Sequence, residues 1–204
     1  MILSLLDSNP LLAVLYTLAL LSAITVHELA HALVADKLGD PTARLQGRIS
    51  LNPLKHLDPI GAAAMLLTGF GWAKPVPVDE YNLRNPKQDF AWVALAGPAS
   101  NMIFAIVLSL FIKTMALGTF SLLLYPFLLL NVNLALFNLL PVHPLDGGKI
   151  IAGILPKNLS IEFESILAKY GFFILIFLIF PFGGQSPASM FLSPISDFIL
   201  RILL

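Results

Sequence analysis

Cysteine is absent from this chain, and charged residues are scarce. Because the 204 residues include no cysteine, a disulfide framework, a thiolate metal site and a cysteine nucleophile are all excluded. Charged side chains make up 12% of the sequence, where soluble domains have about 25%. The 12 basic and 12 acidic residues balance, so the composition gives no argument for a nucleic-acid partner. Any metal in this protein must therefore be held by His, Asp or Glu.

Hydrophobic residues are abundant instead. They make up 57% of the chain, and the mean hydropathy is +0.86. Apolar segments are spread from one end to the other, which leaves no room for a sizeable soluble module. We therefore expect an all-α multi-pass membrane protein, in which residues 1–204 form a single integral-membrane domain. The start of the chain lacks the basic residues of a signal peptide, so the first helix is expected to be retained.

The apolar segments differ in length. Those long enough to cross a bilayer lie at residues 10–38, 90–112, 119–140 and 163–182. Residues 60–72 are apolar but short, and residues 74–78 contain two prolines, so we expect a short extended or re-entrant segment around 60–78. Residues 147–155 predict a partial helix near the surface, and residues 191–204 either span the membrane or lie along its interface. This gives about four to six transmembrane or re-entrant helices.

The first long segment contains an H-E-x-x-H motif at residues 27–31. Residues 10–34 contain no other charged side chain. Two histidines four positions apart share one helix face, about 6 Å apart along the axis, so His27 and His31 can bind one zinc ion while Glu28 handles a proton. Such a motif can arise by chance on a soluble helix. In a membrane segment, however, an unpaired glutamate has a heavy cost and no structural use.

The basic residues predict the topology. Seven of them lie between residues 37 and 87, so the positive-inside rule places this polar loop, which includes His56 as an ordinary loop residue, in the cytoplasm. The first helix is expected to begin at the capping pair Asn9-Pro10 and to end before Gly39, running from outside to inside. His27 and His31 then lie about 26 to 32 Å along it, toward the cytoplasmic end. We expect a multi-pass cell-membrane protein whose active site faces the cytoplasmic side.

A third metal ligand must reach the same depth. Asp146 ends another outside-to-inside segment and precedes Gly147-Gly148, which permits a close backbone approach, so we expect it to be that ligand. His143 is interpreted as an interfacial or second-shell residue, with a ligand role or a hydrogen bond to Asp146 left open. The small residues of segment 97–101 either form a helix-packing notch or also bring Asn101 to the metal.

Three motifs together resemble the site-2 protease family of intramembrane zinc metalloproteases, peptidase family M50, in its minimal prokaryotic branch. They are H-E-x-x-H at 27–31, G-P-x-x-N at 97–101 and N-x-x-P-x-x-x-L-D-G at 138–147, and they cover roughly residues 10–150. Many members have a helix before the H-E-x-x-H helix, and larger members have PDZ or CBS modules. We expect neither feature here.

This resemblance implies a site and a reaction. One zinc ion would be held by His27, His31 and Asp146, and Glu28 would act as the general base for peptide-bond hydrolysis within the membrane. Asn101 and Asn138 would support the site or contact the substrate backbone. The expected partners are a membrane-protein or peptide substrate and the lipid bilayer.

Two alternative functions stay open. The protein could be a membrane-embedded zinc protease that cuts soluble or peripheral substrates at the cytoplasmic face. It could also be a non-catalytic zinc-binding membrane protein, but a carrier does not need Glu28 beside the metal and usually shows polar groups across the whole membrane. For an intramembrane protease, the substrate helix must unwind locally, and the segment 60–78 is placed to offer it an edge strand.

Overall fold

The computed structural model describes residues 7–68, 71–114 and 121–204, and within these ranges it is built from helices without β-strands. The helices are α2 (Pro10–Leu38), α3 (Thr42–Leu45), α4 (Pro59–Thr68), α5 (Pro86–Thr114), α6 (Ser121–Asn138), α7 (Asp146–Ile154), α8 (Lys157–Ile179) and α9 (Pro187–Leu203), with the short 3₁₀ helices η1 (Pro53–Lys55) and η2 (Glu80–Asn82). The all-α prediction is confirmed. Parts of the predicted segments 60–72 and 119–140, namely residues 69–70 and 119–120, lie outside the described residues.

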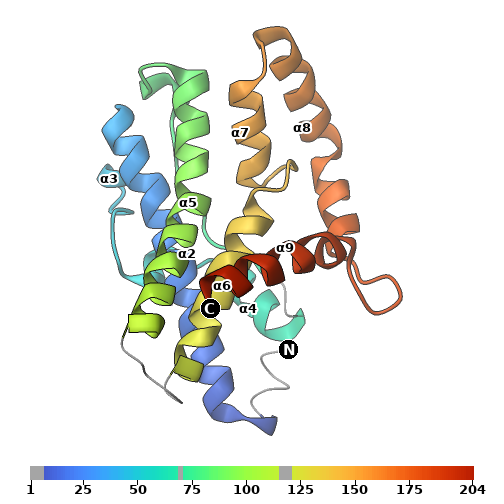
Figure 1. Ribbon diagram of the computed structural model, residues 1–204. Coiled ribbons are helices and arrows are strands. Elements are labelled where there is room, and N and C mark those ends of the chain that lie inside the picture. Colours follow the sequence, from blue (N-terminus) through green and yellow to red (C-terminus); the bar gives the residue numbers. More distant parts are fainter. Residues whose placement is uncertain (1–6, 69–70, 115–120) are drawn as a thin grey trace.

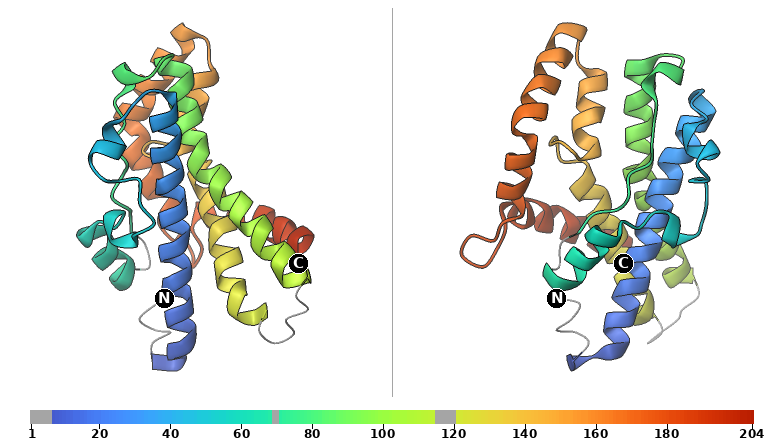
Figure 2. Two further views of the ribbon diagram at one scale, coloured as in Figure 1. Left: turned by 90° about the vertical axis from the view of Figure 1, so that its left-hand side faces the viewer. Right: turned by 180° about the vertical axis from the view of Figure 1, so that it is seen from behind.

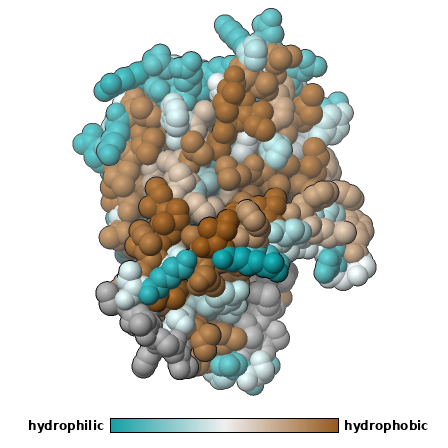
Figure 3. All heavy atoms as spheres, viewed as in Figure 1, coloured by the Kyte–Doolittle hydropathy of each residue, from teal (hydrophilic) through white to brown (hydrophobic). Residues whose placement is uncertain are grey.

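Three helices form the centre of the molecule. In the described part of the chain, α2, α5 and α6 are long and apolar enough to cross a membrane. They pack against one another, and the chain direction alternates from α2 to α5 to α6 (Figures 1 and 2). Hydrophilic residues gather at the end of the molecule where α2 ends and α5 begins, above a mostly hydrophobic body (Figure 3). This is the arrangement expected of a membrane protein.

Small residues line the contacts between these helices. Ala19 and Ala23 of α2 and Ala105 of α5 are fully buried, whereas Leu11 and Leu18 of α2 are 64% and 50% exposed. In lipid, large apolar side chains face the bilayer at no cost, and small ones let two helix backbones approach closely. The close approach of α2 and α5 is what brings polar side chains from both helices into contact at the site described below.

The ends of α2 agree with the sequence. The side chain of Asn9 accepts a hydrogen bond from the Leu12 N–H, and Pro10 occupies the first helical position. Gly39 ends the helix with a φ of 116°, in the left-handed region that glycine adopts without strain. The predicted bounds, 10–38, are therefore confirmed.

The start of α5 was predicted four residues too late, at residue 90 instead of Pro86. The Asp89 carboxylate accepts a 2.7 Å hydrogen bond from the Asn85 N–H, and the side chain is buried. An acidic residue in the first turn satisfies an unpaired amide and favours the positive end of the helix dipole. The polar first turn therefore belongs to the helix, although hydropathy alone assigns it to the loop.

The C-terminal third differs from the predicted spans. The segment 163–182 corresponds to α8, which begins at Lys157 and carries Glu162, Glu164 and Lys169. It is not among the three candidate spans found in the described ranges. Figure 1 shows α8 running from the hydrophilic end only to the level at which α9 crosses α6.

The tail, for which the sequence left two orientations open, forms α9. This helix lies across α6 and also contacts α8 and α5, so it does not run parallel to the central helices (Figure 1). Ser196 faces inward and donates a 2.7 Å hydrogen bond to Oδ1 of Asn133, while Phe191 and Phe198 are 70% and 65% exposed. An amphipathic helix of this kind is suited to lie along a membrane rather than through it.

The predicted re-entrant segment consists of a short helix followed by an irregular stretch. Helix α4 has 10 residues, which is too short to span a bilayer. From residue 71 to the start of η2 the chain forms neither helix nor strand, apart from an isolated bridge between Leu57 and Ala73. This non-helical stretch passes beside α2, where the backbone of Val76 contacts the side chain of Glu28.

Candidate metal centre

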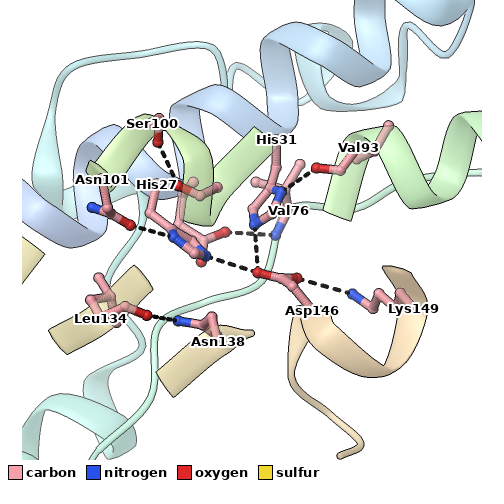
Figure 4. A network of polar contacts seen from close by, with 12 residues as sticks. His27, His31, Val76, Val93, Ser100, Asn101, Leu134, Asn138, Asp146 and Lys149 are labelled. Atoms are coloured by element: carbon pink, nitrogen blue, oxygen red, sulfur yellow. Dashed lines mark hydrogen bonds and ion pairs between the residues drawn. The ribbon is translucent and has the colours of Figure 1, made fainter. Parts of the chain in front are cut away.

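Three side chains from α2 and the start of α7 converge at one point. One ligand atom each from His27, His31 and Asp146 lie within 4.8 Å of one another, and all three residues are buried. Oδ2 of Asp146 is 3.1 Å from Nε2 of His27 and 3.2 Å from Nε2 of His31 (Figure 4). Neighbouring ligand atoms of a tetrahedral zinc ion are separated by roughly 3.4 Å, given bonds of about 2.0 to 2.2 Å. The spacing therefore fits a zinc ion.

Hydrogen bonds on the far side of both rings fix their tautomers. Nδ1 of His31 is 2.7 Å from the carbonyl oxygen of Val93, which can only accept, so this nitrogen carries the proton. Nδ1 of His27 is 2.6 Å from Oδ1 of Asn101 and donates in the same way. In the neutral form of each ring, which is the form that binds a metal, Nε2 is then left with a lone pair that faces Asp146. Partners that orient a histidine through its second nitrogen are the usual support of a metal site.

The orientation of Asn101 is itself fixed. Its Nδ2 donates to the Ala23 carbonyl at 2.9 Å and to Oδ1 of Asn131 at 2.8 Å, so its oxygen must be the atom that faces His27. Asn101 and Asn131 are both fully buried. Asn131 in turn donates to the Phe127 carbonyl of its own helix. A chain of amides thus connects α6 through α5 to a candidate ligand on α2.

Gly97 of α5 lies directly against the two imidazoles. A Cβ atom at this position would overlap Nε2 of both His27 and His31. The small-residue segment 97–101 was predicted to be a packing notch, an approach of Asn101 to the metal, or both. The structure shows the notch, which receives the candidate metal ligands, and Asn101, one turn further on, contacts Nδ1 of His27 on the side of the ring away from Asp146.

Asp146 occupies the first position of α7, where the helix dipole favours a carboxylate. The next residue, Gly147, packs so tightly on the carbonyls of Leu139 and Leu140 that a Cβ atom would overlap them. This confirms the predicted close approach of the backbone. Oδ1 of Asp146 lies 3.9 Å from Nζ of Lys149, which leaves Oδ2 for the histidines.

Glu28 is buried in the same region of α2. Its Oε2 accepts a 3.2 Å hydrogen bond from the backbone N–H of Val76, and within the described ranges it forms no salt bridge. A buried carboxylate held by one amide and by no cation can accept a proton without first breaking an ion pair. The arrangement is therefore suited to a general base beside a metal.

Two of the predicted residues are not drawn into this cluster. Nδ2 of Asn138 donates a 3.0 Å hydrogen bond to the Leu134 carbonyl of its own helix. His143 is exposed at the surface and packs beside Gly171 of α8, without a hydrogen bond to Asp146. The exposed position agrees with the interfacial interpretation of His143, and the structure shows no polar contact of its side chain with Asp146.

Three contacts were not anticipated from the sequence. The carbonyl of Val93 and the amide of Val76 are backbone groups, which no residue type can signal. Asn131 did have a detectable signal, since an asparagine in the middle of an apolar helix needs a buried partner.

Comparison with known proteins agrees with this geometry. Residues 112–178 match the sequence profile of peptidase family M50. The chain is 41% identical over 178 residues to the Bacillus subtilis (strain 168) protein named "Putative zinc metalloprotease YwhC", covering 82% of this chain and 81% of that protein. No solved structure matches the chain.

Two further relatives are longer than this chain. A protein of Methanocaldococcus jannaschii named as a zinc metalloprotease is 32% identical over 157 residues, which cover 76% of this chain and 38% of that protein. The Mycolicibacterium smegmatis protein named "Putative zinc metalloprotease Rip2" is 28% identical over 179 residues, which cover 78% of this chain and 64% of that protein.

Proposed function

Because this chain belongs to peptidase family M50, we propose that this zinc metalloprotease hydrolyses peptide bonds in or near transmembrane segments of membrane proteins. One observation carries the proposal. Glu28 and the two histidines lie in the interior of α2, a helix long and apolar enough to cross a membrane, and they are buried against other apolar helices. Ionisable groups at such depth are costly and indicate function.

We assign the roles of the residues as follows. His27, His31 and Asp146 hold the zinc ion, which when bound acts as a Lewis acid that activates water and polarises the scissile carbonyl. Glu28 accepts the proton of the attacking water and then passes it to the leaving amide nitrogen. Asn101 positions His27 and does not touch the substrate, because both protons of its Nδ2 are already donated.

Asn138 is the better candidate for a substrate contact. Its Nδ2 makes one hydrogen bond, to Leu134, and so retains a second proton, while its Oδ1 has no partner among the residues that the structure describes. Both groups can therefore pair with the backbone of an unwound peptide.

The segment 74–78 is suited to bind such a peptide. The carbonyl of Val76 and the amide of Val78 have no hydrogen-bond partner within the described ranges. A transmembrane substrate must expose its own amides to be cut, and in lipid these amides need partners at once. We propose that Val76 and Val78 provide them by pairing along the edge of this segment. The site would face the cytoplasm, since seven of the 12 basic residues lie between residues 37 and 87, from the last turn of α2 to the first turn of α5.

Mapping the cut site tests the proposal. The purified protein is reconstituted in lipid nanodiscs with a tagged single-span protein, and the products are identified by mass spectrometry. We expect a cut inside the apolar segment or within a few residues of its cytoplasmic end. A protease that leaves such a span intact but cuts soluble or peripheral proteins would be the alternative enzyme, and the proposal would be rejected.

A further inference from the structure

Arg48, in the loop after α3, is a buried cation without a salt bridge. The side chain is 5% exposed, and its backbone N–H donates to the Ala43 carbonyl. Nη1 donates to the Pro75 carbonyl at 2.8 Å, and Nη2 donates to the Lys74 carbonyl at 2.6 Å. Its Nε is buried and has no partner among the described residues. Burying an arginine is costly, so a specific benefit is expected at this position.

The two carbonyls that Arg48 binds belong to the stretch that contacts Glu28. The carbonyl of Pro75 and the N–H of Val76 are parts of one planar peptide group. Arg48 binds the oxygen of this group, and Glu28 binds its N–H. The peptide is therefore held at both edges, with its oxygen toward the cation and its N–H toward the carboxylate, and it cannot rotate without losing a charge-assisted hydrogen bond.

Electrostatics favour the same arrangement. Burial lowers the pKa of the Arg48 guanidinium, and the charge of Glu28 opposes that shift. An arginine stays protonated in either case. The side chain also matches the chemistry of the segment, because Pro75 and Pro77 have no N–H, and a guanidinium, which only donates, can bind consecutive carbonyls.

We infer that Arg48 is a positioning residue for substrate binding: by holding the carbonyls of Lys74 and Pro75 it fixes the segment 74–78, so that Val76 orients Glu28 and the next backbone groups are presented to the peptide. The inference rests on the proposed role of this segment. Arg48 touches neither the metal ligands nor the substrate. A second tether assists it, since the Lys74 N–H donates to the carbonyl of His56 at 2.8 Å.

The test compares Arg48 with a neighbouring arginine. Arg48→Met removes both carbonyl bonds, and Arg48→Lys retains a donor but cannot span two carbonyls as a guanidinium does. Arg44→Gln is the matched control, because Arg44 forms an exposed salt bridge with Asp36, with 61% of its side chain accessible. Each full-length variant is studied in nanodiscs for zinc content, hydrogen–deuterium exchange of residues 71–79, and KM and kcat on the transmembrane substrate.

We expect Arg48→Met to keep its zinc, to exchange the amides of residues 71–79 faster, and to raise KM roughly tenfold or more. Arg48→Lys should be intermediate, and Arg44→Gln should match the native protein. Unchanged exchange and KM in Arg48→Met would overturn the inference. So would a loss of zinc with global unfolding in both Arg48 variants, which would indicate a purely structural residue. If the native protein cuts only soluble substrates, the proposed function fails. The amide exchange of residues 71–79 and the KM on those soluble substrates then still test the inference about Arg48.

Discussion

The Nδ1–H of His27 donates a 2.6 Å hydrogen bond to Oδ1 of Asn101, and this contact joins α2 and α5 at the candidate metal centre. Loss of a partner that orients a metal-binding histidine typically lowers metal affinity 10- to 100-fold. We predict a decrease of about this size for Asn101→Leu, measured by competition with a fluorescent zinc chelator.

Two other variants sharpen this prediction. Asn101→Asp keeps an acceptor for His27 but loses the donors to Ala23 and Asn131, so its affinity should lie between those of Asn101→Leu and the native protein. Asn133→Leu removes a partly buried amide contact of α6, the one with Ser196, and should leave zinc affinity unchanged. Equal affinities for Asn101→Leu and Asn133→Leu would contradict the assignment.

A single methyl group at Gly97 should abolish zinc binding. The Cβ of Gly97→Ala would overlap Nε2 of both histidines, so the rings would have to leave the positions in which Asn101 and the Val93 carbonyl hold them. Zinc content measured by mass spectrometry of the purified protein should fall to background. Ala99→Gly, which makes the opposite change two residues away, should keep its zinc. Full zinc content in Gly97→Ala would show that the imidazoles do not rest on this glycine in the native protein.

Asp40 should stabilise the loop that follows α2 in a pH-dependent way. Burial disfavours its charge, but hydrogen bonds from Thr42, from the Asp79 N–H and from Asn82 outweigh burial and hold the pKa of Asp40 below its usual value. A carboxylate whose pKa is lower in the folded state stabilises the fold above its unfolded pKa, about 3.9, and this contribution disappears as the pH falls toward the folded pKa.

We therefore predict that Asp40→Asn lowers the free energy of unfolding by about 1 to 3 kcal/mol at pH 7, and that its difference from the native protein shrinks between about pH 5 and pH 3. Thermal unfolding in detergent at several pH values measures both. A deficit that stays constant down to pH 3 would contradict the assigned role of the charge.

Removal of the metal should destabilise the protein, because the candidate ligands connect α2 to α7. A ligand that binds only the folded state stabilises it by about 2.7 kcal/mol when its free concentration is 100 times its dissociation constant. A chelator should therefore lower the unfolding temperature, and added zinc should restore it. Asp146→Asn should respond weakly to both. Identical unfolding with and without chelator would argue against a site that bridges the two helices.

Much of the site could be predicted because its signals are local. The spacing of His27 and His31 places both on one helix face, and the topology of the apolar segments brings Asp146 to the same depth. Asn101 was expected near the metal through the small residues around it, and the structure places it against His27. These predictions needed only helix periodicity, hydropathy, the distribution of basic residues and the positions of small residues.

The remaining contacts depend on tertiary packing that no local pattern encodes. The Val93 carbonyl and the Val76 amide look like any other backbone group in the sequence. His143 is close to Asp146 in sequence, but the turn before α7 directs it to the surface beside Gly171. The start of α8 was misplaced because its polar first turns resemble a loop to a hydropathy scan, although they are helical.

The most direct test of the central claim is the activity of Glu28→Gln together with its zinc content. The amide keeps the shape of the side chain but cannot accept the proton of the attacking water, so we predict native zinc stoichiometry and a loss of peptide cleavage of about 10²-fold or more. A zinc-loaded Glu28→Gln protein that cleaves at nearly the native rate would contradict the assignment of Glu28 as the general base at this centre.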